Sequence, residues 1–215
     1  MSKVKCLSHY TSLNNVLAIL KNGSFKFSRL RFMNDLQEAG LEYYYPKLSN
    51  FYSCSFIRFK RESIPMWKMY SKKSERDIGV MIKLVFSHSA SFNELFKNKN
   101  VICKDVSYIK QSQYNKYARG DEISGETIIE GFSKSSCWDF EKEFRYGIYS
   151  TTDEVYCELN FDVLDKIEII VYPTEINVDV RNMKRQRLKT LNIDESLYKK
   201  ISFHKSSLVG ILKNN

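Results

Sequence analysis

The chain has 215 residues and a formal net charge of +9, and 43% of its residues are hydrophobic. That hydrophobic fraction supports a buried core, which argues against an intrinsically disordered chain. The 8 glycines and 3 prolines are too few to favour a glycine-rich nucleotide loop or long linkers. The start of the chain lacks the apolar run of a secretory signal, and no later run is long enough to span a bilayer. We therefore expect a cytoplasmic protein without a membrane contact.

Five cysteines are scattered along the chain without any C-x-x-C pair, which indicates reduced thiols and no structural zinc or other metal site. They are Cys6, Cys54, Cys103, Cys137 and Cys157. The positive charge favours a polyanionic partner such as RNA or DNA, or a phosphorylated cofactor. Solvated lysines without a partner explain the same excess.

The opening of the chain predicts a strand followed by a short helix. Leu13, Val16, Leu17 and Leu20 share one helical face. Thr11 or Ser12 supplies an N-cap and Gly23 a stop. His9-Tyr10-Thr11 then lies where the strand meets the capped helix.

The middle of the chain mixes strands and helices. Alternation of Phe25 and Phe27 with polar residues predicts a strand, and a polar loop at 29–38 leads into a helix. Further strands are expected at 51–57, 78–86 and 101–109, and helices at 63–70, 89–96 and 114–132, the last with a polar break at 120–125.

Sheet segments dominate the last third, at 143–150, 156–162, 167–173 and 201–204. A basic helix is expected at 178–191; its cations are Arg181, Lys184, Arg185, Arg187 and Lys189. The strands do not alternate regularly with helices, and no linker or repeat divides the chain. We therefore predict a single α+β domain over residues 1–215 with a mixed or antiparallel sheet and surrounding helices.

The Glu-x-Glu-x-Arg segment is the sharpest local feature. On a strand, Glu141, Glu143 and Arg145 project from one face, and Phe140 and Phe144 from the core face. Two close carboxylates raise one another's pKa unless a cation such as Arg145 intervenes. Such a pair can stabilise positive charge at an anomeric carbon and accept a proton from a nucleophile. An exposed strand face with alternating charges gives the same pattern.

His9-Tyr10-Thr11 is the second candidate site, because strand ends of this kind often face ligands. A neutral His9 could hydrogen-bond a ribose hydroxyl, and Tyr10 could stack on a planar ring. The alternative is that Thr11 caps the helix and His9 packs below it.

Three weaker features remain. A polar cluster could bind a diphosphate through its arginines, although Asp35 could simply cap a helix; it comprises Arg29, Arg31, Asn34, Asp35 and Glu38. Ser53 and Ser55 share one strand face. Trp67 and Tyr70 are either a stacking wall or part of the core.

Taken in order, these motifs resemble those of a family of bacterial proteins that carry a domain of unknown function. The motifs are His9-Tyr10-Thr11-Ser12, Asn34-Asp35 with Glu38, Ser53-Cys54-Ser55-Phe56, Met66-Trp67 with Tyr70, Gly79-Val80, and Trp138 with Glu141, Glu143 and Arg145. The resemblance extends from about Leu7 to the region of Val171.

That family itself resembles the ADP-ribosyltransferase superfamily. The resemblance implies a split, mixed β-sheet and NAD as substrate. It assigns the nicotinamide ribose to His9 and the nicotinamide pocket to Ser53 and Ser55. It makes Glu143 the catalytic glutamate, while Glu141 orients or deprotonates the acceptor. It also implies an NAD-dependent ADP-ribosyltransferase or NAD glycohydrolase, with a role in a toxin or phage-defence system.

Two other functions remain open. Asp35, Glu38, Glu141 and Glu143 could ligate magnesium in a nuclease, although no Glu-x-Lys arrangement accompanies them. Alternatively, the chain is a non-catalytic nucleic-acid-binding or protein-binding module whose main surface is the basic helix.

Overall fold

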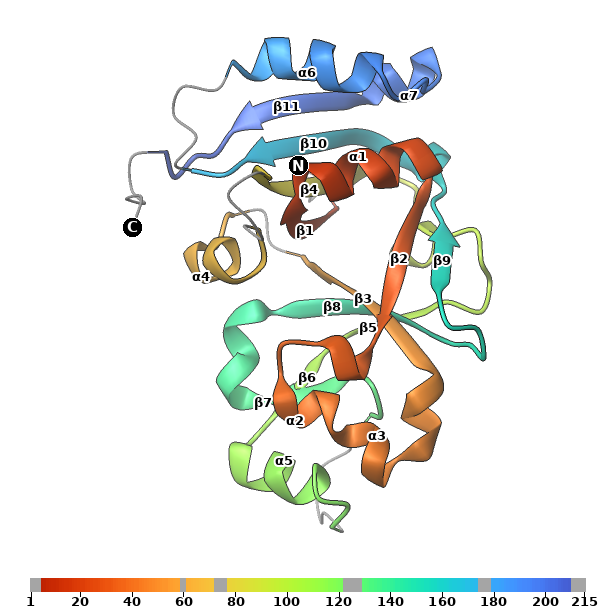
Figure 1. Cartoon of the computed structure of the whole chain (residues 1–215), viewed down its shortest axis with the longest axis vertical. Coiled ribbons are helices and arrows are strands. Elements are labelled where there is room, and N and C mark those ends of the chain that lie inside the picture. Colours follow the sequence, from red (N-terminus) through yellow and green to blue (C-terminus); the bar gives the residue numbers. More distant parts are fainter. Residues whose placement is uncertain (1–4, 59–60, 72–76, 122–128, 174–178, 210–215) are drawn as a thin grey trace. The chain divides into compact units, whose positions relative to one another are not determined.

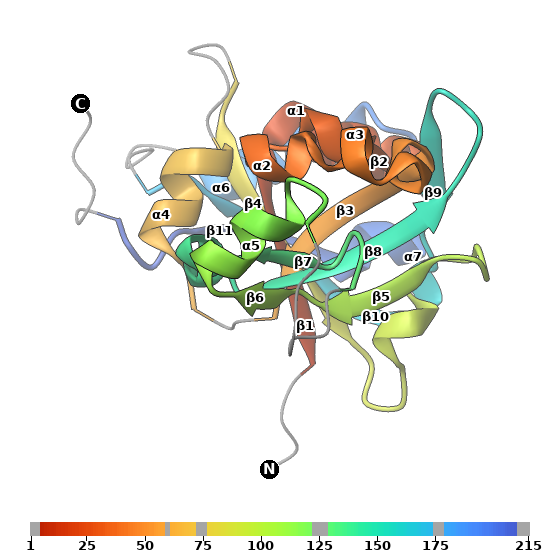
Figure 2. The same ribbon diagram turned by 90° about the horizontal axis from the view of Figure 1, so that it is seen from below.

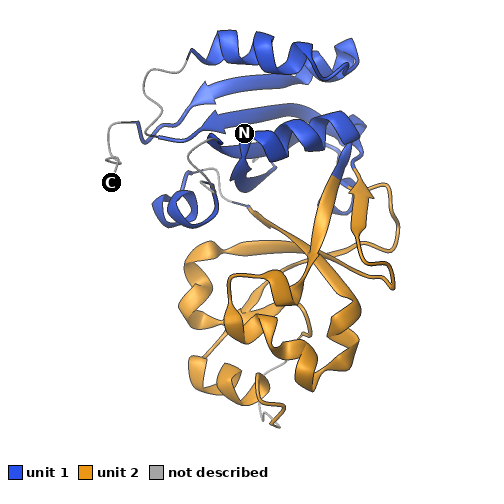
Figure 3. Ribbon diagram, in the orientation of Figure 1, with its two compact units in different colours: residues 1–24, 58–95, 159–215 blue, residues 25–57, 96–158 orange. Residues whose placement is uncertain are grey.

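The computed structural model describes residues 5–58, 61–71, 77–121, 129–173 and 179–209. It confirms a mixed fold in which helices accompany mostly antiparallel strands. The contacts group the chain into two compact units, shown in Figure 3. Unit 1 contains residues 1–24, 58–95 and 159–215, and unit 2 contains residues 25–57 and 96–158. In the described residues, no helix is both long and apolar enough to cross a membrane.

The described residues of unit 1 form four strands in the order β11-β10-β4-β1. These are β1 (Cys6–Ser12), β4 (Gly79–Phe86), β10 (Leu164–Val171) and β11 (Ile201–Lys205). β4 pairs antiparallel with both β1 and β10, and β10 pairs parallel with β11. β4 is almost completely buried, because its apolar residues, including Val80, Ile82 and Leu84, form a nearly continuous run. β10 buries Ile167 and Ile169 but exposes Asp165 and Lys166.

The helices of unit 1 are α1 (Leu13–Asn22), α4 (Ile64–Met66), α6 (Val180–Lys189) and α7 (Glu195–Lys200), and a π-helical turn (Trp67–Ser71) continues α4. α6 and α7 lie beside β11 (Figure 1). α1 confirms the predicted limits, because Ser12 accepts a hydrogen bond from the Asn15 N–H at 3.3 Å and Gly23 is left-handed with φ of 63°.

Unit 2 contains a second set of strands in the order β5-β8-β3-β2-β9. They are β2 (Ser24–Arg29), β3 (Phe51–Ile57), β5 (Ile102–Asp105), β8 (Glu143–Tyr149) and β9 (Val155–Glu158). The pairs β2–β3, β3–β8 and β5–β8 are antiparallel. A separate parallel pair joins β6 (Ser107–Ile109) to β7 (Ser133–Ser135).

The described residues of unit 2 include three short α-helices: α2 (Leu36–Ala39), α3 (Leu41–Tyr44) and α5 (Gln111–Tyr117). Figure 2 shows α2 and α3 following one another, with α5 beside α2. Leu41 of α3 and Tyr114 and Tyr117 of α5 join a core around Phe51, which also includes Phe132. Gly147 allows this packing, because a Cβ there would lie 2.3 Å from the Phe51 ring.

Several predicted elements were wrong in extent. The strand expected at 156–162 ends at Glu158, and residues 161–163 form a 3-10 turn. The helix expected at 89–96 is a single turn at Phe92–Glu94, because the Leu95 carbonyl accepts from Asn160 N–H at 2.8 Å. The strand expected at 101–109 breaks at Val106, whose N–H binds the Glu143 carbonyl at 2.9 Å. The helix expected at 114–132 covers Gln111–Tyr117, part of the rest lies outside the described residues, and residues 130–132 form a turn.

Candidate functional site

The Glu-x-Glu-x-Arg segment crosses a boundary between two elements. Glu141 ends a 3-10 helix (Ser136–Glu141), and β8 begins at Glu143. Lys142 between them is left-handed with φ of 44°. The expectation of three side chains on one strand face is therefore correct for Glu143 and Arg145 and wrong for Glu141. Phe140, expected in the core, is 38% exposed because it belongs to the helical turn.

Glu143 and Arg145 form an intimate buried ion pair. Arg145 Nε donates to Glu143 Oε1 at 2.6 Å, and Arg145 Nη2 donates to Glu143 Oε2 at 3.1 Å. Ser55 Oγ on β3 also donates to Glu143 Oε1. Glu143 is 4% exposed and Arg145 is 0% exposed. An exposed face of alternating charges, the alternative interpretation of this segment, is therefore wrong.

Lys134 on β7 is the residue that the sequence did not indicate. Its Nζ lies 2.7 Å from Glu141 Oε2, 3.4 Å from Glu143 Oε2 and 3.7 Å from Glu38 Oε2. It also lies 5.1 Å from the centre of the Trp138 ring. Nothing in Ser133-Lys134-Ser135 distinguishes this lysine from a solvated one, because the contacts come from the pairing of distant segments.

Glu38 on α2 completes the group. Arg145 Nη1 donates to Glu38 Oε1 and, at 2.6 Å, to the carbonyl of Gly131. We call the five residues of this group the buried charge cluster: Glu38, Lys134, Glu141, Glu143 and Arg145. The group holds three carboxylates and two cations, and all five side chains are buried.

The pKa values follow from these contacts. Burial raises the pKa of the Glu143 carboxyl, but Arg145 and Lys134 outweigh it and hold that pKa at about 2. Burial raises the pKa of Glu38, with Arg145 opposing. The two carboxyls differ because Glu143 accepts from three side chains, whereas Glu38 Oε2 has no hydrogen-bond donor in the described part of the chain. Burial lowers the pKa of Lys134, but the neighbouring carboxylates raise it by more, so the pKa lies above its ordinary value.

The polar cluster predicted around residues 29–38 is divided among different partners. Arg29 donates to Tyr52 Oη and, at 3.3 Å, to Asp153, and Arg31 lies 3.7 Å from Glu42. Asp35 accepts from the N–H groups of Gln37 and Glu38, so the capping interpretation is confirmed. Asn34 is exposed. The five residues therefore do not form one diphosphate site.

The two strand serines have different environments. Ser55 binds Glu143, whereas Ser53 is 1% exposed and its hydroxyl has no hydrogen-bond partner within the described ranges. Both lie in unit 2 with Glu143. The structure thus brings Ser55, but not Ser53, into contact with the predicted catalytic glutamate.

His9, Tyr10 and Thr11 lie on β1 in unit 1. His9 is half-buried and pairs with Ile82 across the sheet. Tyr10 accepts from Ser63 N–H at 2.8 Å, and burial raises the pKa of Tyr10 to about 12. Because Tyr10 is 5% exposed, its expected stacking on a ligand is wrong. Thr11 accepts from the Asn15 side chain at 2.9 Å.

The predicted stacking wall is part of the core of unit 1. Trp67 is 0% exposed, and its ring contacts Tyr10 and Tyr172 edge to face at 4.9 and 5.5 Å. Trp67 Nε1 donates to Glu62 at 2.9 Å. Tyr70 is half-buried in the following π-helical turn. Trp67 therefore presents no open face to a ligand.

The predicted basic helix is present as α6 in unit 1. Four of its cations are exposed, namely Arg181, Arg185, Arg187 and Lys189. Lys184 differs, because its Nζ lies 4.4 Å above the Tyr198 ring and burial lowers its pKa. The predicted residue 178 lies outside the described residues.

Carboxylates that could bind magnesium are arranged around cations. Glu38, Glu141 and Glu143 all face Lys134 Nζ, and Asp35 instead caps α2. Over the described ranges, no group of three or more His, Cys, Asp or Glu side chains is arranged to hold a metal ion. The Lys134 ammonium group thus occupies the position that a magnesium ion shared by these carboxylates would need.

Comparisons with known proteins do not assign the chain to a family. No protein-family model, no curated protein and no solved structure matches the chain. The geometry of the two units is therefore the basis for any functional argument.

Proposed function

We propose that this chain is an NAD-dependent ADP-ribosyltransferase or NAD glycohydrolase with Glu143 as its catalytic carboxylate. The main support is that Arg145, Lys134 and Ser55 keep Glu143 ionised in a buried site. A carboxylate with a pKa of about 2 is an anion at every physiological pH. That suits the stabilisation of positive charge and not general acid–base catalysis, which needs a pKa near the working pH.

The proposed reaction breaks the bond between nicotinamide and the ribose C1′ of NAD, and the electron pair leaves with nicotinamide. Glu143 stabilises the oxocarbenium-like charge that develops at C1′. A nucleophile on a nucleic acid or other macromolecule, or water, then bonds to C1′ and loses its proton to Glu141.

Burial places a condition on this chemistry. Glu143 is 4% exposed, so substrate must open the buried charge cluster to reach it. Lys134 makes the longest of the side-chain contacts to Glu143, at 3.4 Å, and a closer contact of 2.7 Å to Glu141. Lys134 is therefore the residue that substrate displaces.

The test is nicotinamide release from NAD by the purified chain, with and without RNA, DNA and cell lysate. We expect release by the natural chain and loss of at least tenfold in Glu143→Gln and Ser55→Ala. Glu158→Gln is the matched control, because Glu158 is an exposed glutamate paired with Lys97. Thermal unfolding of each variant identifies loss of fold. If the natural chain neither releases nicotinamide nor binds NAD in calorimetry, the proposal is contradicted.

A second candidate is a non-catalytic module that binds nucleic acid, and the observation favouring it is the exposed basic surface of α6. Its four exposed cations have no ion-pair partner in the described segments. Exposed arginines and lysines of this kind contact phosphates. Under this candidate, Glu143→Gln leaves nucleic-acid binding intact.

A further inference from the structure

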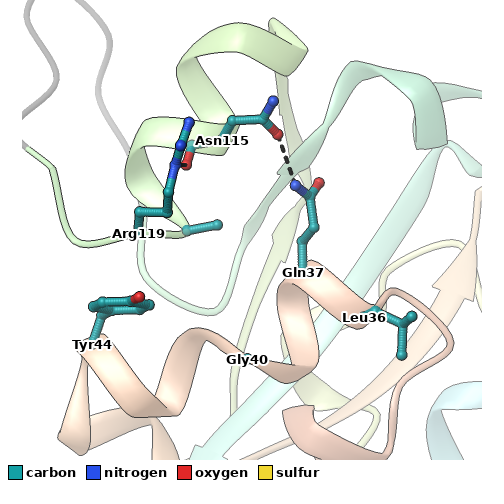
Figure 4. Close-up of a pocket in the computed structure, with 7 residues that line it drawn as sticks. Leu36, Gln37, Gly40, Tyr44, Asn115 and Arg119 are labelled. Atoms are coloured by element: carbon teal, nitrogen blue, oxygen red, sulfur yellow. Dashed lines mark hydrogen bonds between the residues drawn. The ribbon is translucent and has the colours of Figure 1, made fainter.

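An open pocket of ≈ 400 Å³ lies in unit 2 between α2–α3 and α5 (Figure 4). Leu36, Gly40 and Tyr44 line one side at intervals of four residues, which places them on one face of consecutive helices. Asn115 and Arg119 line the other side from α5 and the turn after it. The volume falls in the range of about 300–1,000 Å³ that is usual for ligand sites.

A network of side-chain amides holds one wall of the pocket. Gln37 Nε2 donates to Asn115 Oδ1 at 2.7 Å, the bond drawn in Figure 4. Gln111 Nε2 donates to both Gln37 Oε1 and Asn115 Oδ1, at 2.9 and 2.6 Å. These bonds fix the orientation of the amides, so the polar groups of the wall are positioned before any ligand arrives.

The charge of the lining is purely positive. Arg119 is the single charged residue among the seven that line the pocket. Its Nε donates to the Asn115 carbonyl at 3.0 Å, which fixes the base of the guanidinium. Its other two nitrogens have no partner in the described part of the chain. A guanidinium with two available nitrogens is suited to a phosphate.

Tyr44 provides an aromatic surface in the same pocket. Its ring is 44% exposed and lines the pocket opposite Arg119 (Figure 4). Gly120 supports the ring from its own side, because a Cβ at Gly120 would lie 2.9 Å from Tyr44 Cδ1. Tyr43 contacts the ring edge to face at 4.9 Å. The ring is thus held in place with area left for stacking.

Exposed apolar side chains continue beyond the pocket along the same segment. Outside the lining, Phe32 is 70% exposed and Tyr43 82%, and Leu36 at the pocket wall is 86% exposed. The Arg31 guanidinium lies 5.1 Å from the Phe32 ring, so cations and rings are interleaved. Gathered exposed apolar groups mark an interaction surface, and rings interleaved with arginines are typical of surfaces that bind single-stranded nucleic acid.

We propose that this pocket and the rings beside it bind single-stranded nucleic acid, with one base stacked on Tyr44 and its phosphate on Arg119. Amides of the Gln37–Asn115 wall meet the edge of the base. Phe32 and Tyr43 lie outside the pocket lining, so neighbouring nucleotides of a longer strand use them. The site is independent of the transferase proposal, because binding requires neither NAD nor Glu143.

The test is fluorescence anisotropy of the full chain with a labelled 12-nucleotide oligouridylate, without NAD. We expect Tyr44→Ala to weaken binding about 5- to 100-fold. Arg119→Gln weakens it and lowers the slope of log affinity against log salt by about 0.7. The matched controls are Tyr156→Ala and Arg61→Gln, exposed residues that do not line the pocket, and we expect them to bind like the natural chain.

Three results would overturn this site: no binding of the oligonucleotide, equal losses in pocket and control variants, or equally tight binding of uridine monophosphate. Retention of a lysate protein by the natural chain but not by Tyr44→Ala, without oligonucleotide binding, would assign the surface to a protein partner. Glu143→Gln keeps oligonucleotide binding, so failure of the transferase proposal and failure of this site give different results.

Discussion

The buried charge cluster of unit 2 and helix α6 of unit 1 are both rich in charge, and their environments are opposite. In the cluster, Arg145 is 0% exposed and bonded to two carboxylates. On α6, Arg185 is exposed and makes no ion pair within the described residues. Charge in a low-dielectric interior is held by its partners, whereas surface charge is screened by water and salt. The same residue type is therefore structural in one unit and available for binding in the other.

Removing an arginine from each region gives the largest expected contrast. Arg145→Met leaves Glu38 and Glu143 buried without their main cation, which costs about 3–5 kcal/mol of unfolding free energy. The matched change Arg185→Met alters it by less than about 0.5 kcal/mol. Urea unfolding at neutral pH measures both. Similar losses in the two variants would contradict the assignment of the buried cluster as a structural network.

Lowering the pH affects the two regions differently, because acid protonates Glu143 but leaves the cations of α6 charged. The folded pKa of Glu143, about 2, lies below its ordinary value of 4.5. Its stabilising contribution is therefore present above pH 4.5 and is lost as the pH falls toward 2, by about 3 kcal/mol. The measurement is unfolding free energy against pH for the natural chain minus that for Glu143→Gln. A difference that stays constant over this range would show that Glu143 is not held ionised.

Substitution of the two serines on β3 measures the contribution of the single hydrogen bond from Ser55 to Glu143. Ser55→Ala removes a donor from a buried carboxylate, with an expected loss of about 1.5–3 kcal/mol. Ser53→Ala removes a buried hydroxyl that has no partner in the described part of the chain, so stability stays equal or rises. Thermal unfolding of the two variants decides. A larger loss in Ser53→Ala would reverse the proposed roles of the two side chains.

The smallest effect on stability is expected on α6. Changing Arg181, Arg185 and Arg187 together to Gln alters the unfolding free energy little, because all three are exposed. If α6 binds duplex DNA, the slope of log affinity against log salt falls by about 0.9 for each phosphate contact removed. Filter binding at several salt concentrations measures the slope. An unchanged slope would show that these arginines of α6 do not contact the DNA phosphates.

Local pattern predicted much of the fold. The limits of β3 matched the prediction, because two serines alternate there with Tyr52, Cys54 and Phe56, a two-residue period that is read directly from the chain. α1 matched because its apolar period, its cap at Ser12 and its stop at Gly23 agree. The helix expected at 89–96 was wrong because the Leu95 carbonyl bonds to distant Asn160. A contact between segments so far apart has no local signature.

The candidate site also has parts that local pattern predicted and parts that it did not. The pairing of Glu143 with Arg145 follows from the two-residue period of a strand and was predicted. The position of Glu141 was not, because Lys142 turns the chain through a left-handed conformation that a lysine rarely adopts. Lys134 reaches the site through tertiary packing, and only the structure reveals it. The sequence grouped Glu38 with Glu141 and Glu143 only as possible magnesium ligands, and the structure pairs it with Arg145 and Lys134.

The odd number of charges in the cluster has a consequence for the heat of folding. Two cations cannot neutralise three carboxylates, and burial raises the pKa of Glu38, whereas that of Glu143 is lowered, so Glu38 retains its proton more readily than Glu143. Between the ordinary carboxyl pKa and that raised value, the unfolded chain has lost this proton and the folded chain carries it. Folding in that range therefore takes a proton from the buffer, and the calorimetric enthalpy changes with the ionisation heat of the buffer.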